Sequence, residues 1–310
     1  MFKYLDYNIV EYRFLKGSFM KRLLPSRFCA GISAISAAIS TLICSVFGAI
    51  MMILNFDGDV GYFKSNALNV IFTILCIGAV AWLLVAAIMT RTDGLKFHPC
   101  PEAGAESIIS LVASAVFLVA GGITIYIFAK LDKTSLLLAG VFGVLAAFYH
   151  LSLFTKEKRL TPGENTMALL GYATVIFYIC LVIYMYLDVF VTMNSPVKML
   201  LIFALVASMT ATLSDVRYVI GRELPRYSLA AHGINLILGC TSAVSTITRY
   251  ITASAPDVHP NHTLGYIPYI ISAFIVLTSA VISGARLHSA VHASSEISED
   301  ESADTQEEGI

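Results

Sequence analysis

Polar and small residues recur along one side of an otherwise apolar stretch, residues 228–251. They are spaced three or four positions apart, so on a helix they fall within an arc of about 100°: His232, Asn235, Gly239, Ser242, Thr246 and Arg249. Such a face cannot favourably contact lipid, so it must face other helices or a water-filled cavity. Close helix packing explains the glycine and the hydroxyls. It leaves His232 and Asn235 in need of partners.

Ionisable partners for this face occur at the ends of two other apolar stretches. His150 lies near the end of residues 134–154, and Asp215 near the end of residues 197–216. A histidine beside a carboxylate can bind a proton or a cation near neutral pH, and ionisable residues in membrane helices are functional candidates. We therefore predict a ligand-binding site composed of His232, Asn235, His150, Asp215, Ser242 and Thr246. The alternative is that these groups lie at headgroup depth, where water solvates them.

A second, smaller set of charged residues lies toward the opposite ends of the stretches. Asp188 and Arg249 each come near the end of an apolar segment. We predict an ion pair between them on the outer side of the membrane. Pairs in such a position usually contribute little to stability and have a structural role.

Signatures of enzymes and of bound cofactors are absent from the sequence. It contains no H-E-x-x-H, G-x-S-x-G or Walker lysine motif. His98 and Cys100 could supply two metal ligands, whereas a structural zinc site usually has four. Haem between helices would need two histidines at matched depth, and only His150 and His232 qualify. We therefore predict a protein that is not an enzyme, with no metal and no cofactor.

The elements that must position these residues are membrane helices. Of the 310 residues, 57% are hydrophobic and 13% charged, against about 25% charged in soluble domains. Apolar blocks of about 20 residues match the hydrocarbon core when they are helical. The sequence therefore predicts an all-α, polytopic helical membrane protein with about eight transmembrane helices, at residues 28–54, 66–90, 107–129, 134–154, 167–191, 197–216, 228–251 and 264–285.

The distribution of basic residues predicts the orientation of these helices. If the N-terminus is cytoplasmic, 15 of the 20 Lys and Arg residues fall on the cytoplasmic side. Membrane proteins are oriented with the excess of Lys and Arg in the cytoplasm. We therefore expect both termini to be cytoplasmic, in an integral protein of the plasma membrane.

The two ends of the chain differ in composition from the membrane domain, residues 28–291. Residues 1–27 form a basic head that is either an amphipathic helix on the membrane surface or a flank that only sets topology. Residues 292–310 carry seven acidic residues and are predicted to be a disordered cytoplasmic tail. Head and tail could both bind protein partners. The basic head is explained by topology, so nucleic acid is not expected as a partner.

A weak internal similarity appears when the chain is shifted by 124 residues, which brings Pro101 onto Pro225 and Tyr126 onto Tyr250. It predicts a tandem 4+4 parallel repeat, a symmetry known among transporters. Short matches of this kind also arise by chance in apolar sequence.

Two classes of function fit these observations. The first is a transporter or binding protein for a small solute or ion, with a polar cavity that faces the cytoplasm. The second is a non-catalytic membrane scaffold or regulatory subunit that acts through its protein partners. The polar face of residues 228–251 and the repeat favour the first class. The scarcity of charge in mid-membrane speaks against it.

Overall fold

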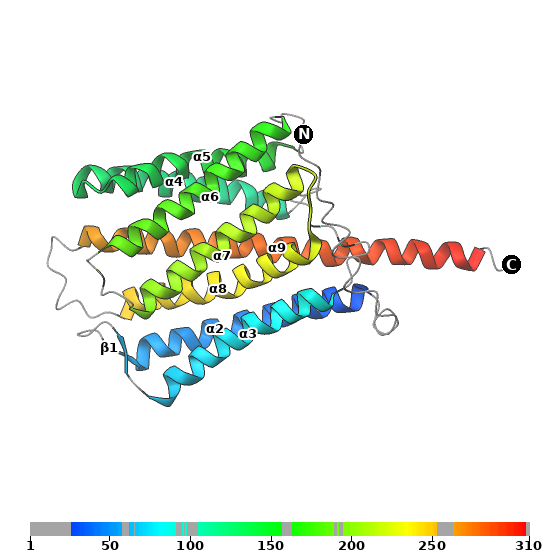
Figure 1. The fold of residues 1–310 in the computed structure, drawn as a ribbon, viewed down its shortest axis with the longest axis horizontal. Helices are drawn as coiled ribbons and strands as arrows, with labels where there is room; N and C mark the ends of the chain where they lie inside the picture. Colours follow the sequence, from blue (N-terminus) through cyan, green and yellow to red (C-terminus); the bar gives the residue numbers. More distant parts are fainter. Residues whose placement is uncertain are drawn as a thin grey trace, which may run out of the picture.

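The computed structural model describes residues 26–57, 62–64, 66–90, 95, 97, 105–156, 163–188, 191, 195–252 and 263–307. These residues form eight α-helices and one pair of two-residue strands (Figure 1): α2 (Ser26–Leu54), β1 (Phe56–Asp57), β2 (Tyr62–Phe63), α3 (Ala67–Met89), α4 (Ala105–Leu131), α5 (Thr134–Lys156), α6 (Glu164–Leu187), α7 (Pro196–Val219), α8 (Pro225–Thr252) and α9 (Thr263–Glu307). The strands pair antiparallel, with Phe56 opposite Phe63. The basic head predicted for residues 1–27 falls almost entirely outside the described residues.

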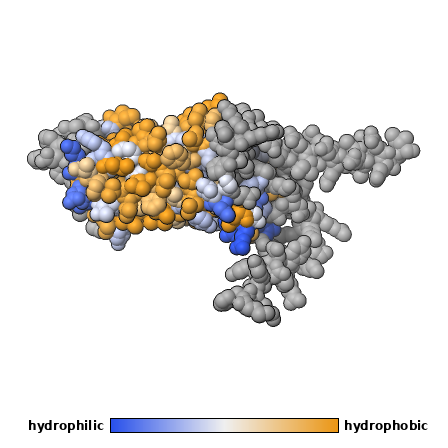
Figure 2. Space-filling model, turned by 90° about the horizontal axis from the view of Figure 1, so that it is seen from above, coloured by the Kyte–Doolittle hydropathy of each residue, from blue (hydrophilic) through white to orange (hydrophobic). Residues whose placement is uncertain are grey.

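Each of the eight helices is long and apolar enough to cross a membrane. The prediction of an all-α protein with eight membrane helices is therefore confirmed, including the separation of α4 from α5 by two residues, Asp132 and Lys133. Apolar side chains cover the face of the bundle seen in Figure 2, and they include exposed large residues such as Ile39, Ile74 and Leu169. Lipid is the environment that such a surface requires. The chain is a multi-pass membrane protein.

Local signals fix several helix ends. Ser195 precedes Pro196, and its hydroxyl accepts a hydrogen bond from the backbone N–H of Lys198 at 3.3 Å, so α7 begins at Pro196. Asn66 caps α3 in the same way: its side-chain oxygen accepts a hydrogen bond from the backbone N–H of Asn69. The short turn between α7 and α8 contains Gly221 with φ of +69°, a conformation that glycine adopts without strain.

The helices are arranged in two groups around α8 and α9 (Figure 1). The consecutive helices α4, α5, α6 and α7 pack side by side, and α9 closes this group by packing against α4 and α7. The second group is the pair α2 and α3. Both pack on α8, which also packs against α7 and α9. As a result, α8 lies between the two groups and is among the most buried helices.

The eight helices alternate in direction, so α2 begins at the same end of the bundle at which the last turns of α9 lie (Figure 1). We call this the terminal end. The end that carries β1 is called the far end. Helices α7 and α9 run from the far end to the terminal end, and α8 runs in the opposite direction.

Two predictions about the organisation of the chain, a disordered tail at residues 292–310 and a 4+4 repeat, stay predictions. Helix α9 continues to Glu307. A helix that extends from a packed segment needs no new nucleation, and glutamate is a good helix former. The 4+4 repeat would match α3 with α7 and α4 with α8. The repeat stays a prediction.

Glycines bring neighbouring helices into close contact. A Cβ atom on Gly140 would lie 2.9 Å from the carbonyl oxygen of Gly121 and 3.0 Å from the backbone N of Ile125, which joins α5 tightly to α4. A Cβ atom on Gly239 of α8 would lie 2.8 Å from the carbonyl oxygen of Val276 in α9. Small residues at such contacts are the usual means of helix association in membranes.

We expect Gly140→Ala to lower the free energy of unfolding by about 1–3 kcal/mol, because the new methyl group meets backbone atoms that cannot move aside. Gly122→Ala in the same helix pair is the matched control, since a Cβ there has nothing within 4 Å, and it should not destabilise. Unfolding by denaturant in detergent micelles measures both. Equal stability of the two variants would contradict the close packing of α4 on α5.

Candidate functional site

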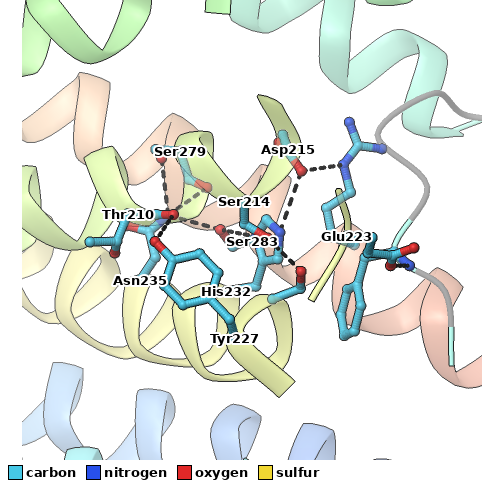
Figure 3. A network of polar contacts seen from close by, with 12 residues as sticks. Thr210, Ser214, Asp215, Glu223, Tyr227, His232, Asn235, Ser279 and Ser283 are labelled. Atoms are coloured by element: carbon cyan, nitrogen blue, oxygen red, sulfur yellow. Dashed lines mark hydrogen bonds and ion pairs between the residues drawn. The ribbon is translucent and has the colours of Figure 1, made fainter. Parts of the chain in front are cut away.

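A buried carboxylate lies in the half of the bundle nearer the terminal end, where α7, α8 and α9 meet (Figure 3). Asp215 stands one turn before the end of α7. Its Oδ1 atom lies 3.4 Å from Nε2 of His232 in α8 and 4.0 Å from Nε of Arg286 in α9. The side chains are 8%, 1% and 3% exposed, respectively. A charge removed from water is costly unless it is paired, and Asp215 is paired by two other helices.

The second ring nitrogen of His232 contacts a serine of α9. Nδ1 lies 3.1 Å from the hydroxyl of Ser283. The amide nitrogen of Asn235 donates to the same hydroxyl oxygen at 2.8 Å. An ionised carboxylate only accepts hydrogen bonds, so a neutral His232 ring that donates toward Asp215 has its hydrogen on Nε2, and its Nδ1 can accept from the Ser283 hydroxyl. A Ser–His–Asp chain therefore crosses the interface of three helices.

Asn235 connects the same three helices one turn further into the bundle. Its amide nitrogen also donates to the carbonyl oxygen of Ser279 at 3.1 Å and to the Ser279 hydroxyl at 3.0 Å. Its amide oxygen accepts a hydrogen bond from the Ser208 hydroxyl of α7 at 2.9 Å. All of these groups are buried. A buried polar network whose members are satisfied fixes the packing of its helices, so Asn235 holds α7 and α9 against α8.

A phenyl ring covers this network from the terminal end. The ring of Phe97 stacks on the ring of His232, with centroids 5.8 Å apart and planes 18° apart. The backbone N–H of Phe97 donates to the Glu223 carboxylate at 2.7 Å, and Figure 3 shows Glu223 beside the network. Arg226, in the first turn of α8, donates from Nε to the carbonyl oxygen of Thr90. Glu223 in the α7–α8 turn thus binds Phe97, and Arg226 at the beginning of α8 binds Thr90. The Phe97 ring that stacks on His232 shields it from water.

His150, the fourth ionisable residue of the predicted site, lies beside the network rather than in it. It belongs to α5 and is buried, and its ring contacts those of Phe117 and Tyr149, with centroids at 4.7 and 5.2 Å. Asp215 and Arg286 lie close enough for their charges to act on it. Neither ring nitrogen has a hydrogen-bond partner among the described residues. The structure thus brings His150 near Asp215 without a direct bond.

Ser242 and Thr246 lie further along α8, toward the far end. Both are fully buried, and within the described part of the chain neither hydroxyl has a hydrogen-bond partner. The hydroxyl of Ser272 in α9 is likewise buried and has no hydrogen-bond partner among the described residues. The buried hydroxyl of Thr124 in α4 differs, because it donates to the carbonyl oxygen of Ala120 at 2.9 Å, whereas those of Ser45, Thr241 and Ser245 likewise have no partner among the described residues. The hydroxyls of α8 and α9 therefore retain unused hydrogen-bonding capacity inside the bundle.

A second buried cluster with charged side chains lies at the far end. The Asp188 carboxylate accepts a hydrogen bond from the Tyr269 hydroxyl of α9 at 2.7 Å, and the Asp188 carbonyl oxygen accepts one from the Lys198 ammonium of α7 at 2.8 Å. The guanidinium of Arg249 lies over the ring of Phe56, 4.5 Å from its centroid. These contacts place Asp188 and Arg249 with other partners, and the ion pair between them stays a prediction.

Several members of the two clusters were not predicted from the sequence. The most important is Arg286, which directly follows the predicted helix at residues 264–285 and so was counted as a flanking basic residue. A signal was available: Ser272, Ser279, Ser283 and Arg286 are spaced like the polar residues of α8 and fall within an arc of about 100°. Lys198 was likewise counted as a charge outside the membrane, yet it is buried.

Comparison with known proteins adds no candidate function, because no protein-family model, curated protein or solved structure matches the chain. The described residues contain no group of three or more His, Cys, Asp and Glu side chains that could hold a metal ion. Function is carried by sites rather than by folds. The network around Asp215 is therefore the basis on which a function can be proposed.

We expect Asp215→Asn to lower the free energy of unfolding by about 3–5 kcal/mol, because it leaves the charge of Arg286 buried without its carboxylate. The double variant Asp215→Asn/Arg286→Gln should be less destabilised than the sum of the single variants. Arg217→Gln, at an exposed position of the same helix, is the control and should change stability little. Additive losses in the double variant, measured by denaturant unfolding in micelles, would show that the two side chains are not coupled.

Proposed function

We propose that the protein is a membrane transporter for a small ion or solute, and that its substrate crosses between α7, α8 and α9. The supporting observation is a row of buried hydroxyls that have no hydrogen-bond partner in the described part of the chain and that lie between two buried clusters with charged side chains. In this proposal His232, Asn235, His150 and Asp215 form the binding site at the terminal end. Asp188 and Lys198 belong to the cluster at the far end.

Each of the three helices presents one polar face, and the three helices pack against one another. We call these faces together the polar seam. On each helix the residues fall within an arc of about 100°: Ser208, Thr212 and Asp215 on α7; His232, Asn235, Ser242 and Thr246 on α8; Ser272, Ser279, Ser283 and Arg286 on α9. The seam therefore continues from the charged network toward Tyr269 and Asp188 at the far end.

The energetics of the seam favour a role beyond packing. A buried hydroxyl that makes no hydrogen bond costs about 1–3 kcal/mol, and the protein could have placed alanine or valine at Ser242, Thr246 and Ser272. Hydroxyls in this state provide oxygen atoms for water or for a passing ion. Polar residues inside membrane proteins commonly mark such pathways.

The alternative function is that of a membrane scaffold that binds protein partners, and one feature favours it. Helix α9 continues well past the bundle at the terminal end (Figure 1), with an acidic sequence that includes Glu296, Glu299 and Asp300. In either case we propose that the terminal end is cytoplasmic, at the plasma membrane. The excess of Lys and Arg on that side supports this orientation.

We expect protein reconstituted in liposomes to pass protons, Na⁺ or K⁺, measured with pyranine for protons and with isotope uptake for the two metal ions. Ser242→Ala/Thr246→Val should reduce this flux by about tenfold, because it removes two of the hydroxyls that would contact the ion. Thr124→Val is the matched control: this threonine is equally buried, but its hydroxyl is bound to its own helix. Flux equal to that of empty liposomes for all three ions, or full flux in the double variant, would disprove transport along the seam.

A further inference from the structure

From the arrangement around Asp215 we infer that the transported ion is the proton and that His232 is the group that binds it. This inference rests on the proposed transport function and specifies its substrate. It follows from the charges that surround the Asp215 carboxylate, from the hydrogen bonds of His232, and from the position of Arg286.

The surroundings of Asp215 disfavour a metal cation. A site for Na⁺ or K⁺ collects several oxygen ligands around the ion, whereas the Asp215 oxygen is faced by a guanidinium at 4.0 Å and an imidazole at 3.4 Å. A guanidinium is always charged and has no acceptor atom, so it repels a metal ion at this distance. A proton needs only a lone pair, which the imidazole ring supplies.

The hydrogen bonds of His232 give the proton a place to bind. With the hydrogen on Nε2 facing Asp215, the lone pair of Nδ1 accepts from the Ser283 hydroxyl. An incoming proton takes this lone pair, and Nδ1–H then donates to the Ser283 oxygen. The displaced hydroxyl hydrogen turns to the carbonyl oxygen of Ser279, four residues earlier in α9, a bond that helical serines commonly make. No covalent bond other than N–H forms, and release of the proton reverses the same step.

Proton binding also changes the partner of Asp215. His232 and Arg286 approach the same oxygen atom, Oδ1. When His232 is neutral, Arg286 supplies the positive charge for this carboxylate. When His232 is protonated, its ring supplies positive charge to the carboxylate from a shorter distance than Arg286 does, and the two cations repel each other. We infer that the proton loosens Arg286 from Asp215, and so loosens α9 from α7.

The groups that face His232 support this reading. From α7 it meets Asp215, from α9 Ser283, and from the segment after α3 the ring of Phe97, while Arg286 of α9 approaches the same Asp215 oxygen. Of the other two helices that pack on α8, α3 contains no Asp, Glu, His, Lys or Arg, and α2 contains only Arg27, in its first turn. His150 of α5 lies within range of the same charges. The charge of His232 is therefore set by the Asp215 carboxylate, 3.4 Å away, and by the Arg286 guanidinium that faces the same carboxylate oxygen.

The test is nitrogen NMR of the full-length protein in lipid nanodiscs, labelled with ¹⁵N-histidine, between pH 5 and 8. His232→Gln identifies the His232 signals among the seven histidines. In the wild type we expect hydrogen on Nε2 at the alkaline end and both nitrogens protonated at the acidic end. In the Arg286→Gln variant, His232 should bind the proton at least about tenfold more tightly, because the competing positive charge is removed. In the Asp215→Asn variant, His232 should bind it at least about tenfold more weakly, because the negative charge is removed.

Two further variants keep the test decisive if Asp215→Asn does not fold. Ser283→Ala removes the partner of Nδ1, together with one acceptor of the Asn235 amide, and should alter the tautomer without adding or removing charge. Arg286→Lys keeps the charge and should leave the proton affinity of His232 near that of the wild type. His232 that stays neutral throughout this pH range, or that titrates identically in Arg286→Gln and the wild type, would overturn the inference.

This experiment separates the inference from the transport function. If liposomes carry an ion while His232 does not titrate, transport stands and the proton site fails. If His232 titrates as expected while liposomes pass no proton, the proton site stands as a sensor and transport fails.

Discussion

A carboxylate inside an apolar bundle is the constraint on which the structure depends. Asp215 lies where water does not compensate its charge, so the chain must bring hydrogen-bond donors and positive charge to it. His232 and Arg286 come from the two helices that pack beside α7. Satisfying one charge therefore determines the relative position of three helices. The hydrogen bonds of Asn235 hold the same three helices one turn deeper.

The close packing of the bundle follows from a different interaction. Lipid tails are as apolar as leucine, so helices in a membrane gain little from the hydrophobic effect and depend on close contact and hydrogen bonds. Glycine contacts join α4 to α5 and α8 to α9, and Gly48 of α2 meets Ser245 of α8 in the same way. These contacts let α8 lie against α2 on one side while its polar face remains against α7 and α9.

The fold could be predicted from the sequence more fully than the site. Long apolar stretches are sufficient to locate membrane helices, because the thickness of the bilayer sets their length. The polar face of α8 was also visible, and it led to Asp215 and His150 as partners. Arg286 and Lys198 were missed because a charge near the end of an apolar stretch has two outcomes. It either reaches water or is enclosed by neighbouring helices, and the sequence of one helix does not tell which. Only the packing of α9 and α7 decides it.

The polar face of α8 also has a consequence for the biogenesis of the protein. Among the eight helices, α8 is the least hydrophobic, because His232, Asn235 and five buried Ser and Thr residues occupy positions that lipid-facing helices give to leucine or valine. Polar residues near the centre of a helix oppose its insertion as a single segment. The partition of α8 into the bilayer therefore depends on α7 and α9, which offer it polar contacts once they are present. The helix that carries most of the polar network is thus also the one that needs the rest of the chain to enter the membrane.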